Sequence, residues 1–322
     1  MIEVKALSKQ FGSLTAVDRI SFSLQAGETL ALVGTSGCGK TTTLKMINRL
    51  IEPSSGEIRV NGQDVMDQPP EQLRREMGYV IQHIGLFPHY TITENVGLVP
   101  SLLGWSKNKI AERTHFLLDR LGLDPALYAD KFPHQLSGGQ QQRVGIARAL
   151  AADPPIILMD EPFGALDPIT RADIRGDFLE LEELASKTTL IVTHDVEEAF
   201  EMADWICLLD KGRIQQLGRP SDLLFQPANN FVRQFLADKQ LQLEFLVVRL
   251  SDLLAYLPEG NPATGALELR PEHSIFQAMG RFTKLPHGDA QAYIRYPGGV
   301  KIFDLATLTN GYHRTLSQTK GL

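Results

Sequence analysis

The chain of 322 residues is 43% apolar, and its 38 acidic against 32 basic side chains give a formal net charge of −6. This length predicts two domains, or one large α/β domain with an appendage, and the acidic balance disfavours a nucleic-acid backbone as a partner. No apolar run reaches the roughly 18 residues of a membrane span, the start has no hydrophobic signal core, and two cysteines make no disulfide scaffold, so we expect a cytoplasmic protein.

Strand patterns alternate with helix patterns over the first 237 residues. Apolar residues alternate at 2–6 and 20–24, as in strands with one buried face, and the apolar run at 29–33 indicates a fully buried strand. Further strands are predicted at 78–82, 155–160, 189–193 and 205–209, and helices at 40–50, about 92–122, 140–152, 168–186, 195–203 and 229–236. This alternation predicts a doubly wound parallel sheet, with a helical subdomain at about 88–150.

Residues 238–322 change character and predict a small, separate α+β domain. Turn signals at Pro258 to Gly260 and at Pro297 to Gly299 separate short elements. The strands predicted at 292–296 and 300–303 flank the second turn and indicate a hairpin. We place the boundary between the two domains at 237/238, after the last helix of the first domain.

A glycine-rich loop after the strand at 29–33 has the pattern of a P-loop, which binds phosphate. The residues of this pattern are Gly34, Thr35, Ser36, Gly37, Cys38, Gly39, Lys40 and Thr41, followed by Thr42. The glycines allow successive N–H groups to point into one concavity, and the following helix adds the positive end of its dipole. Lys40 adds a full charge near the phosphates, and the Thr41 hydroxyl can bind Mg²⁺. The sequence therefore predicts a nucleotide site here.

The apolar strand predicted at 155–160 ends in two carboxylates, Asp160 and Glu161. In a P-loop protein we expect this strand beside the P-loop strand, which brings Asp160 to the Mg²⁺. Glu161 follows the strand's end, where it could orient a water against the terminal phosphate. Nearby phosphate charge raises the pKa of such a carboxyl group and helps it to act as a base. Acids after a buried strand are common by themselves, so this prediction depends on the P-loop.

A second loop offers a capping serine and exposed amides to an anion, just before the helix predicted at 140–152. Its residues are Ser137, Gly138, Gly139 and Gln140. One bound nucleotide does not need two such loops. This segment resembles the signature sequence of the ATP-binding-cassette (ABC) ATPases, in which two copies pack head to tail. Each ATP then lies between the P-loop of one copy and the signature of the other, and the resemblance covers about residues 1–237.

The resemblance implies ATP hydrolysis with Mg²⁺ as cofactor, on a P-loop NTPase (RecA-like) core sheet with an N-terminal antiparallel β part and a helical subdomain. It implies four further site residues, which are Phe11 for stacking on adenine, Gln82 for Mg²⁺ and the attacking water, Asp167 for the dimer interface and His194 for the γ-phosphate. The implied Mg²⁺ ligands are Thr41, Gln82 and Asp160, and the implied catalytic residues are Glu161, His194 and Gln82. A lone histidine at a strand end is more often structural, so that alternative stays open for His194.

Three segments, at 45–53, 79–89 and 136–170, resemble one branch of this family. This branch contains the ATPase subunits of importers for glycine betaine, choline, carnitine and related osmoprotectants. The resemblance implies a protein at the cytoplasmic face of the membrane that powers import by ATP-driven closure and opening of its dimer. The implied partners are a second copy, membrane permease subunits and, indirectly, an extracytoplasmic solute-binding protein. Related amino-acid importers share much of this sequence, so the solute stays open.

The stretch from Gln82 to Trp105 is unusually apolar, and in importers of this family it forms the groove for a short coupling helix of the permease. Leu86, Phe87 and Pro88, if exposed, would fit such a contact. The alternative is that these side chains pack the helical subdomain.

Segments at 249–254, 272–279 and 302–305 resemble parts of ligand-sensing modules of the cystathionine-β-synthase (CBS) type. The length of residues 238–322 suits one degenerate module. We expect this accessory domain to dimerise and to tune activity by solute or ionic strength. A purely structural dimerisation tail is the alternative.

Other functions of the ABC ATPases remain as alternatives. A non-transport ABC ATPase that acts on nucleic acid or ribosomes usually has duplicated cassettes, long coiled coils or basic surfaces. This chain has one cassette, no sustained heptad and an acidic balance, so we expect no nucleic-acid partner. An exporter ATPase uses the same chemistry in the reverse direction, and the direction of transport is not encoded in these motifs.

Overall fold

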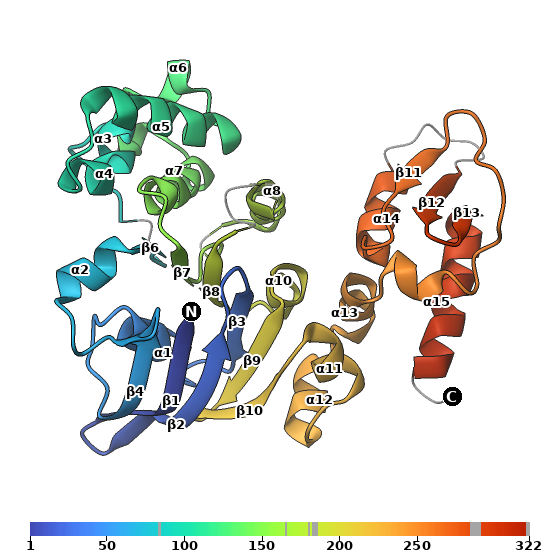
Figure 1. Ribbon diagram of the computed structural model, residues 1–322, viewed down its shortest axis with the longest axis horizontal. Coiled ribbons are helices and arrows are strands. Elements are labelled where there is room, and N and C mark those ends of the chain that lie inside the picture. The colour runs from blue at the N-terminus through green and yellow to red at the C-terminus, as the bar shows by residue number, and fades with distance from the viewer. Residues whose placement is uncertain (83–84, 165, 180, 182–185, 284–290, 320–322) are drawn as a thin grey trace. The chain divides into compact units, whose positions relative to one another are not determined.

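The computed structural model describes the chain except for residues 83–84, 165, 180, 182–185, 284–290 and 320–322 (Figure 1). It divides into two compact units, Met1–Leu217 and Gly218–Leu322. In the described part of the chain, no helix combines the length and the hydropathy that a membrane span requires.

The division between the units lies twenty residues before the boundary predicted at 237/238. The reason is the packing of α11 (Pro220–Phe225), which contacts both α12 (Asn230–Ala237) and α13 (Gln240–Val247). Phe225 also packs against the hydrophobic core of the second unit. The helix predicted at 229–236 as the end of the first domain therefore belongs to the second unit.

The N-terminal part of the first unit is an antiparallel sheet with the strand order β2–β1–β4–β5. Its strands are β1 (Ile2–Phe11), β2 (Leu14–Leu24), β4 (Ser55–Val60) and β5 (Gln63–Asp64). Along β1, Ile2 and Val4 are buried while Glu3 and Lys5 are exposed. The predicted antiparallel β part is confirmed.

The second sheet of this unit has six strands in the order β10–β9–β3–β8–β7–β6. They are β3 (Thr29–Gly34), β6 (Met77–Val80), β7 (Ile156–Asp160), β8 (Thr188–Val192), β9 (Trp205–Asp210) and β10 (Arg213–Gly218). The pairs β9–β3, β3–β8, β8–β7 and β7–β6 are all parallel, which confirms the predicted parallel sheet.

One predicted neighbour in this sheet is wrong. We expected the strand ending at Asp160 beside the P-loop strand, but β8 lies between β3 and β7. The P-loop still connects to β7 through a helix. The helix α1 (Lys40–Ile47), which follows the P-loop, contacts both β8 and β7. Helix α1 therefore reaches across the intervening strand.

Both faces of the six-stranded sheet are buried. In β7, Ile156 and Leu158 belong to the core shared with the antiparallel sheet, whereas Ile157 and Met159 belong to the core shared with the helices. Successive side chains of a strand point to opposite faces, so a strand covered on both sides reads as one continuous apolar run.

The helices of the first unit include a subdomain between β6 and β7, drawn in green in Figure 1. Besides α1, the helices are α2 (Pro70–Arg75), α3 (Ile92–Val96), α4 (Leu98–Leu102), α5 (Lys107–Arg120), α6 (Pro125–Tyr128), η1 (Pro133–Gln135), α7 (Gly138–Leu150), α8 (Pro168–Leu179) and α10 (Val196–Met202). The helical pattern predicted at about 92–122 is divided in the structure among three helices, α3, α4 and α5. Gly104 takes a left-handed φ of +76°, and Ser106 caps a new helix at α5.

The second unit is an α+β fold, as predicted. Its elements besides α11–α13 are η2 (Leu250–Leu253), β11 (Leu267–Leu269), α14 (Ile275–Phe282), β12 (Ala292–Tyr296), β13 (Gly299–Phe303) and α15 (Leu305–Thr319). The predicted hairpin is confirmed by the antiparallel pairing of β12 with β13, and β11 pairs parallel with β12. The segment at 249–254 forms a bridge and a 3-10 turn rather than a strand.

Candidate functional site

The P-loop joins β3 to α1, and glycine is required at both of its ends. A Cβ atom on Gly34 would lie 1.9 Å from the carbonyl oxygen of Leu209 on β9. Gly39 has a φ of +103° and is the N-cap of α1, where no side chain caps the helix. The first N–H groups of α1 are therefore left without the partner that a capping side chain would supply, which is the arrangement that binds anions.

Lys40 is buried inside this loop, where 6% of it is exposed. Its Nζ donates to the carbonyl oxygens of Gly34 (2.8 Å) and Thr35 (3.1 Å). Ser36 and Gly37 are exposed at the loop's tip, whereas Cys38 is buried and Thr42 is half-buried on α1. A full positive charge is thus held within the loop of backbone amides.

Thr41 and Asp160 meet at the start of α1. The Thr41 hydroxyl donates to Oδ1 of Asp160 over 2.8 Å. Asp160 is almost fully buried, and burial raises the pKa of its carboxyl group although the hydrogen bond from Thr41 acts in the opposite direction. A buried carboxylate beside a hydroxyl supplies the hard oxygen ligands that Mg²⁺ prefers, and a cation there would favour the charged form of Asp160. These two residues fit a magnesium site.

Glu161 follows β7 in a strained backbone conformation. Its φ is +48°, which is uncommon for a residue other than glycine, and its N–H donates to the carbonyl oxygen of Val192 (2.8 Å). Oε2 of Glu161 accepts a hydrogen bond from Nε2 of Gln82 (3.0 Å) and lies 3.4 Å from Nδ1 of His194. The structure therefore brings three predicted catalytic residues together at one carboxylate oxygen.

Two carboxylates near the site were not predicted from the sequence. Asp210, at the end of β9, accepts a hydrogen bond from the Thr35 hydroxyl over 2.9 Å. An acid at the end of a predicted strand was the available signal, as it was for Asp160. Glu198 on α10 is buried. It accepts a hydrogen bond over 2.8 Å from the hydroxyl of Thr193, which is the residue before His194. A glutamate that directly follows another glutamate gives no sequence sign of burial.

The signature loop forms the N-terminus of α7. Ser137 and Gln140 make a reciprocal capping box, in which the Gln140 N–H donates to Oγ of Ser137 (3.3 Å) and the Ser137 N–H to Oε1 of Gln140 (2.9 Å). Ser137 and Gly138 are exposed. Gly139 is buried, and a Cβ there would lie 2.6 Å from Cγ2 of Thr170 on α8. Gly139 is thus also needed for the packing of α8.

The remaining predicted site residues lie outside the P-loop pattern in the sequence. Phe11 is half-exposed at the end of β1, with Nζ of Lys9 5.0 Å from its ring centroid. Asp167 is exposed before α8 and accepts from the N–H of Thr170 (3.1 Å). Among the described residues, no hydrogen bond or ion pair joins Phe11 or Ser137 to the P-loop.

In the stretch predicted to meet a permease, some of the apolar side chains pack inside the helical subdomain and others are exposed. Leu86 is half-buried and packs against the core of the helical subdomain, as the alternative interpretation expects. Phe87 and Pro88 are exposed. Tyr90, whose ring centroid lies 5.4 Å from that of Phe87, lines a groove of about 460 Å³ together with residues of α3, α4 and the start of α5, among them Gly97 and Ile110.

This site and fold define a P-loop nucleotide-binding protein, with a lysine inside the loop and a threonine–aspartate pair beside it. Residues 17–164 match the family model described as ABC transporter. The chain is 46% identical over 283 residues to the glycine betaine uptake system ATP-binding protein YehX of Escherichia coli (strain K12), which is 87% of this chain and 92% of that protein. The chain therefore belongs to the ABC transporter ATP-binding family, and the predicted family is confirmed.

Other relatives and solved structures agree. The glycine betaine/carnitine/choline transport ATP-binding protein OpuCA of Bacillus subtilis (strain 168) is 52% identical over 242 residues, which is 75% of this chain. The match spans only 63% of that relative's length. A dimeric ATP-binding cassette in a post-hydrolysis state, bound to ADP and Pi, is 35% identical with a TM-score of 0.61. That likeness covers 68% of this chain and 98% of the solved one.

Proposed function

We propose that this chain binds and hydrolyses ATP as the energy-supplying subunit of a membrane importer for glycine betaine and related quaternary-amine osmoprotectants. The observation that carries the ATPase proposal is the meeting of Gln82 and His194 on the Glu161 carboxylate, one residue after the buried Asp160. The osmoprotectant assignment rests on the relatives, because the subunit's own site handles only the nucleotide. A sulfate/thiosulfate import relative is also 44% identical, so the solute is the more specific part of the proposal.

The residues of the site divide the work of hydrolysis. The uncapped N–H groups of α1 and the Lys40 ammonium bind the β- and γ-phosphates, while Phe11 stacks on adenine. Glu161 accepts the proton of the attacking water, Gln82 orients that water, and His194 bonds the γ-phosphate. This mechanism requires positioning and charge neutralisation rather than a covalent intermediate.

Thr41 and Asp160 would hold Mg²⁺, together with Gln82. When bound, the metal ion neutralises charge on the β- and γ-phosphates. The described residues contain no cluster of three or more His, Cys, Asp or Glu side chains suited to a metal. Mg²⁺ in nucleotide sites is usually bound by one or two carboxylates together with substrate phosphates, so a site with Asp160 as its one carboxylate agrees with the proposal.

The two phosphate-reading loops imply a head-to-tail dimer. Among the described residues, no hydrogen bond joins the signature loop to the P-loop of its own chain. A second copy would bring this loop, with Ser137, Gly138, Gly139 and Gln140, to the γ-phosphate. Asp167 lies on the interface loop. ATP then closes the dimer, and loss of the γ-phosphate releases it. Permease subunits would dock at Phe87 and the groove beside it, which keeps the protein at the cytoplasmic face of the membrane. An extracytoplasmic solute-binding protein would deliver the solute.

The test is Glu161→Gln with saturating ATP and Mg²⁺. We expect a stable dimer with two trapped ATP molecules and hydrolysis at least ~100-fold slower than in the wild type, because the base is lost while the phosphate contacts remain. Light scattering measures the dimer, and phosphate release measures turnover. Glu112→Gln, at an exposed position on α5, is the matched control and should behave as the wild type. A monomeric Glu161→Gln protein, alone and in its complex, would contradict the proposal.

The solute is tested separately in the assembled importer. We expect labelled glycine betaine to enter vesicles only with ATP and a solute-binding protein present, and to compete with choline or carnitine but not with sulfate. Uptake of sulfate instead would replace the osmoprotectant assignment and leave the ATPase proposal intact.

A further inference from the structure

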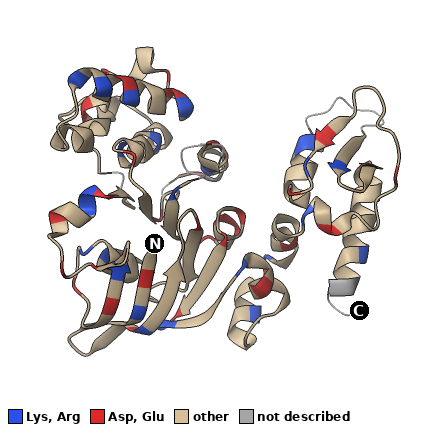
Figure 2. Ribbon diagram, viewed as in Figure 1, with Lys and Arg blue, Asp and Glu red and all other residues tan. Residues whose placement is uncertain are grey.

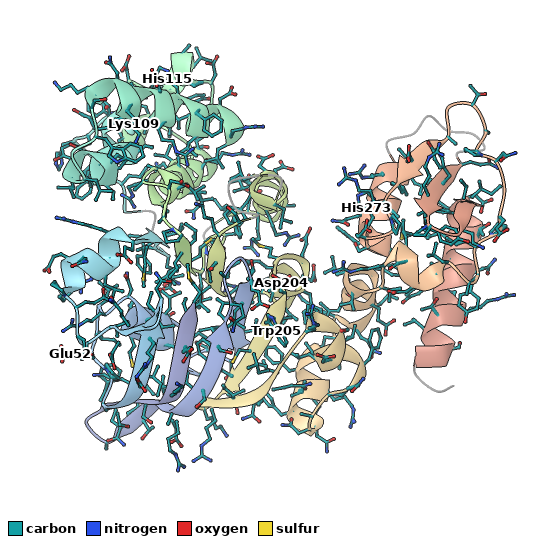
Figure 3. All side chains as sticks on the ribbon, in the orientation of Figure 1. Glu52, Lys109, His115, Asp204, Trp205 and His273 are labelled. Carbon is teal, nitrogen blue, oxygen red and sulfur yellow. The ribbon has the colours of Figure 1, made fainter. Side chains whose placement is uncertain are left out.

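The second unit contains a polar cavity that the proposed ATP site does not use. It has a volume of about 580 Å³ and lies among β11, the turn after it, α14 and β12. Its charged lining residues are Glu268, Arg270, Arg281 and Arg295, and His273 also lines it. Figure 3 labels His273 just before α14, and Figure 2 shows basic residues on α14 and β12 near the acidic position of β11.

The charges of this cavity do not cancel. The carboxylate of Glu268 already has partners within the chain. It accepts a hydrogen bond from the Tyr293 hydroxyl (2.8 Å) and forms an ion pair with Nε of Arg295 (3.2 Å). In the part of the chain that the structure describes, the guanidinium groups of Arg270 and Arg281 have no recorded hydrogen bond or ion pair. Two positive charges therefore remain on the wall of a cavity large enough for a small solute.

His273 adds a hydrogen-bond donor to the same wall. Its Nδ1 accepts the backbone N–H of Arg270 over 3.1 Å, so a neutral imidazole carries its proton on Nε2. Burial lowers the pKa of His273, and the charges of Arg281 and Arg270 lower it further, while Glu272 acts in the opposite direction. Arg270, His273 and Arg281 all line this one cavity.

We propose that this cavity binds a phosphate-bearing anion, either inorganic phosphate or a small phosphomonoester. Guanidinium groups bind phosphate oxygens through paired N–H donors, and Nε2–H of His273 supplies one more. Leu269 and Pro271 also line the cavity and would face the organic part of an ester. This site is independent of the proposed function, because none of its residues belongs to the first unit.

The P-loop also binds phosphate, so the test needs a readout at His273 itself. In the full chain carrying Lys40→Ala, the pKa of His273 is followed by NMR of labelled histidine during titration with inorganic phosphate. An anion beside an imidazole favours its charged form, so we expect a saturable rise of about half a pKa unit or more. Chloride at equal ionic strength should give no saturable rise, and a His273→Gln chain assigns the signal.

Arg270→Gln and Arg281→Gln should each weaken phosphate binding at His273 at least ~10-fold, because each removes one of the two unpaired charges. Arg314→Gln, at an exposed position on α15, is the matched control and should leave the affinity unchanged. Glucose 6-phosphate is compared with phosphate. Tighter binding of the ester assigns the site to a phosphomonoester, and equal binding assigns it to free phosphate. No saturable rise, or equal weakening by Arg314→Gln, would overturn the proposal.

Discussion

Gly34 and Gly37 show how single residues set the shape of the phosphate loop. Both have a positive φ, but their surroundings differ. A Cβ on Gly34 would collide with the backbone of β9 at Leu209, whereas a Cβ on Gly37 would meet nothing within 4 Å. The first glycine is required by packing and backbone together, the second by backbone alone.

We therefore expect Gly34→Ala to lower the free energy of unfolding by at least about 3 kcal/mol, because a fixed carbonyl cannot move aside. Gly37→Ala should cost about 1–2 kcal/mol, the penalty of a left-handed residue with a side chain. Urea unfolding followed by tryptophan fluorescence measures both values. Trp105 and Trp205 are the chain's two tryptophans and lie in the first unit, so the signal reports that unit. Equal losses for the two variants would contradict this account.

Glu198 is a buried carboxyl group that is hydrogen-bonded to Thr193, the residue before His194. One oxygen accepts from Thr193, and the other has no hydrogen-bond partner among the described residues. Burial raises the pKa of Glu198 to about 7, and the charge of Asp195 adds to this rise, while the Thr193 hydrogen bond and the charges of Arg175 and Arg171 oppose it. The folded protein therefore holds a proton here that the unfolded chain releases near pH 4.5.

This shift predicts a stability that falls as pH rises. Between pH 4.5 and about 7 the folded state binds more protons at Glu198 than the unfolded state, so the group's contribution is complete below pH 4.5 and is lost above about 7. The difference is on the order of 3 kcal/mol. Glu198→Gln should remove this slope from urea unfolding curves recorded from pH 5 to 8. Glu197→Gln, one residue earlier on α10, should keep the slope; its loss there would argue against Glu198 as the cause.

At the scale of elements, the N-terminus of α7 has two functions that substitution can separate. Ser137 caps its own helix, and in the proposed dimer it also faces the γ-phosphate of the other copy. Asp is as good a cap as Ser, but it adds a negative charge. The cap is a matter of stability within one chain, whereas the charge matters only where phosphate approaches.

Ser137→Asp should therefore keep the free energy of unfolding within about 0.5 kcal/mol and yet abolish ATP-dependent dimerisation in the Glu161→Gln background. Ser106→Asp makes the same change at the cap of α5 and should leave dimerisation intact. Dimerisation is measured by light scattering at saturating ATP. A Ser137→Asp protein that still dimerises with ATP would show that this loop does not approach phosphate.

The sequence predicted most elements but not their neighbours. Continuous apolar runs identified the five strands of the six-stranded sheet that pair in parallel, because both faces of that sheet are covered, whereas β10 was not predicted. The order of strands depends on long-range pairing, so the position of β8 between β3 and β7 had no local signal. Likewise, periodicity indicated a helical region at about 92–122 without dividing it, although Gly104 and the Ser106 cap are local signals of a break.

The candidate site was predictable where its residues follow a fixed spacing. Lys40 and Thr41 belong to one sequence pattern, that of the P-loop. The structure adds the contact of Thr41 with Asp160, which is 119 positions away in the sequence. Asp210 and Glu198 were not predicted, because no motif spacing marks them and their burial arises only after the strands and α10 pack. Spacing thus predicts the residues of a loop, while tertiary packing selects the charges around it.

At the scale of the whole molecule, the two units separate the proposed activities. All residues of the predicted ATP site lie in Met1–Leu217, and the polar cavity lined by Arg270 and Arg281 lies in Gly218–Leu322. The accessory role of the second unit, as a single CBS-like regulatory or dimerisation module, stays a prediction. Its unpaired guanidinium groups are exposed to salt, and ions screen such charges over about 8–10 Å at physiological strength.

A chain that ends at Leu217, the last residue of the first unit, should therefore hydrolyse ATP within about threefold of the full chain, because it keeps the P-loop, Glu161 and the signature loop. In the assembled importer, the same deletion should change the dependence of uptake on salt concentration. Uptake is measured in vesicles across a series of salt concentrations, with the Arg270→Gln, Arg281→Gln double variant beside the truncation. If the guanidinium groups carry the response, the double variant reproduces the truncated curve while keeping the domain. A truncated protein whose salt curve matches that of the full chain would leave the second unit with a structural role only.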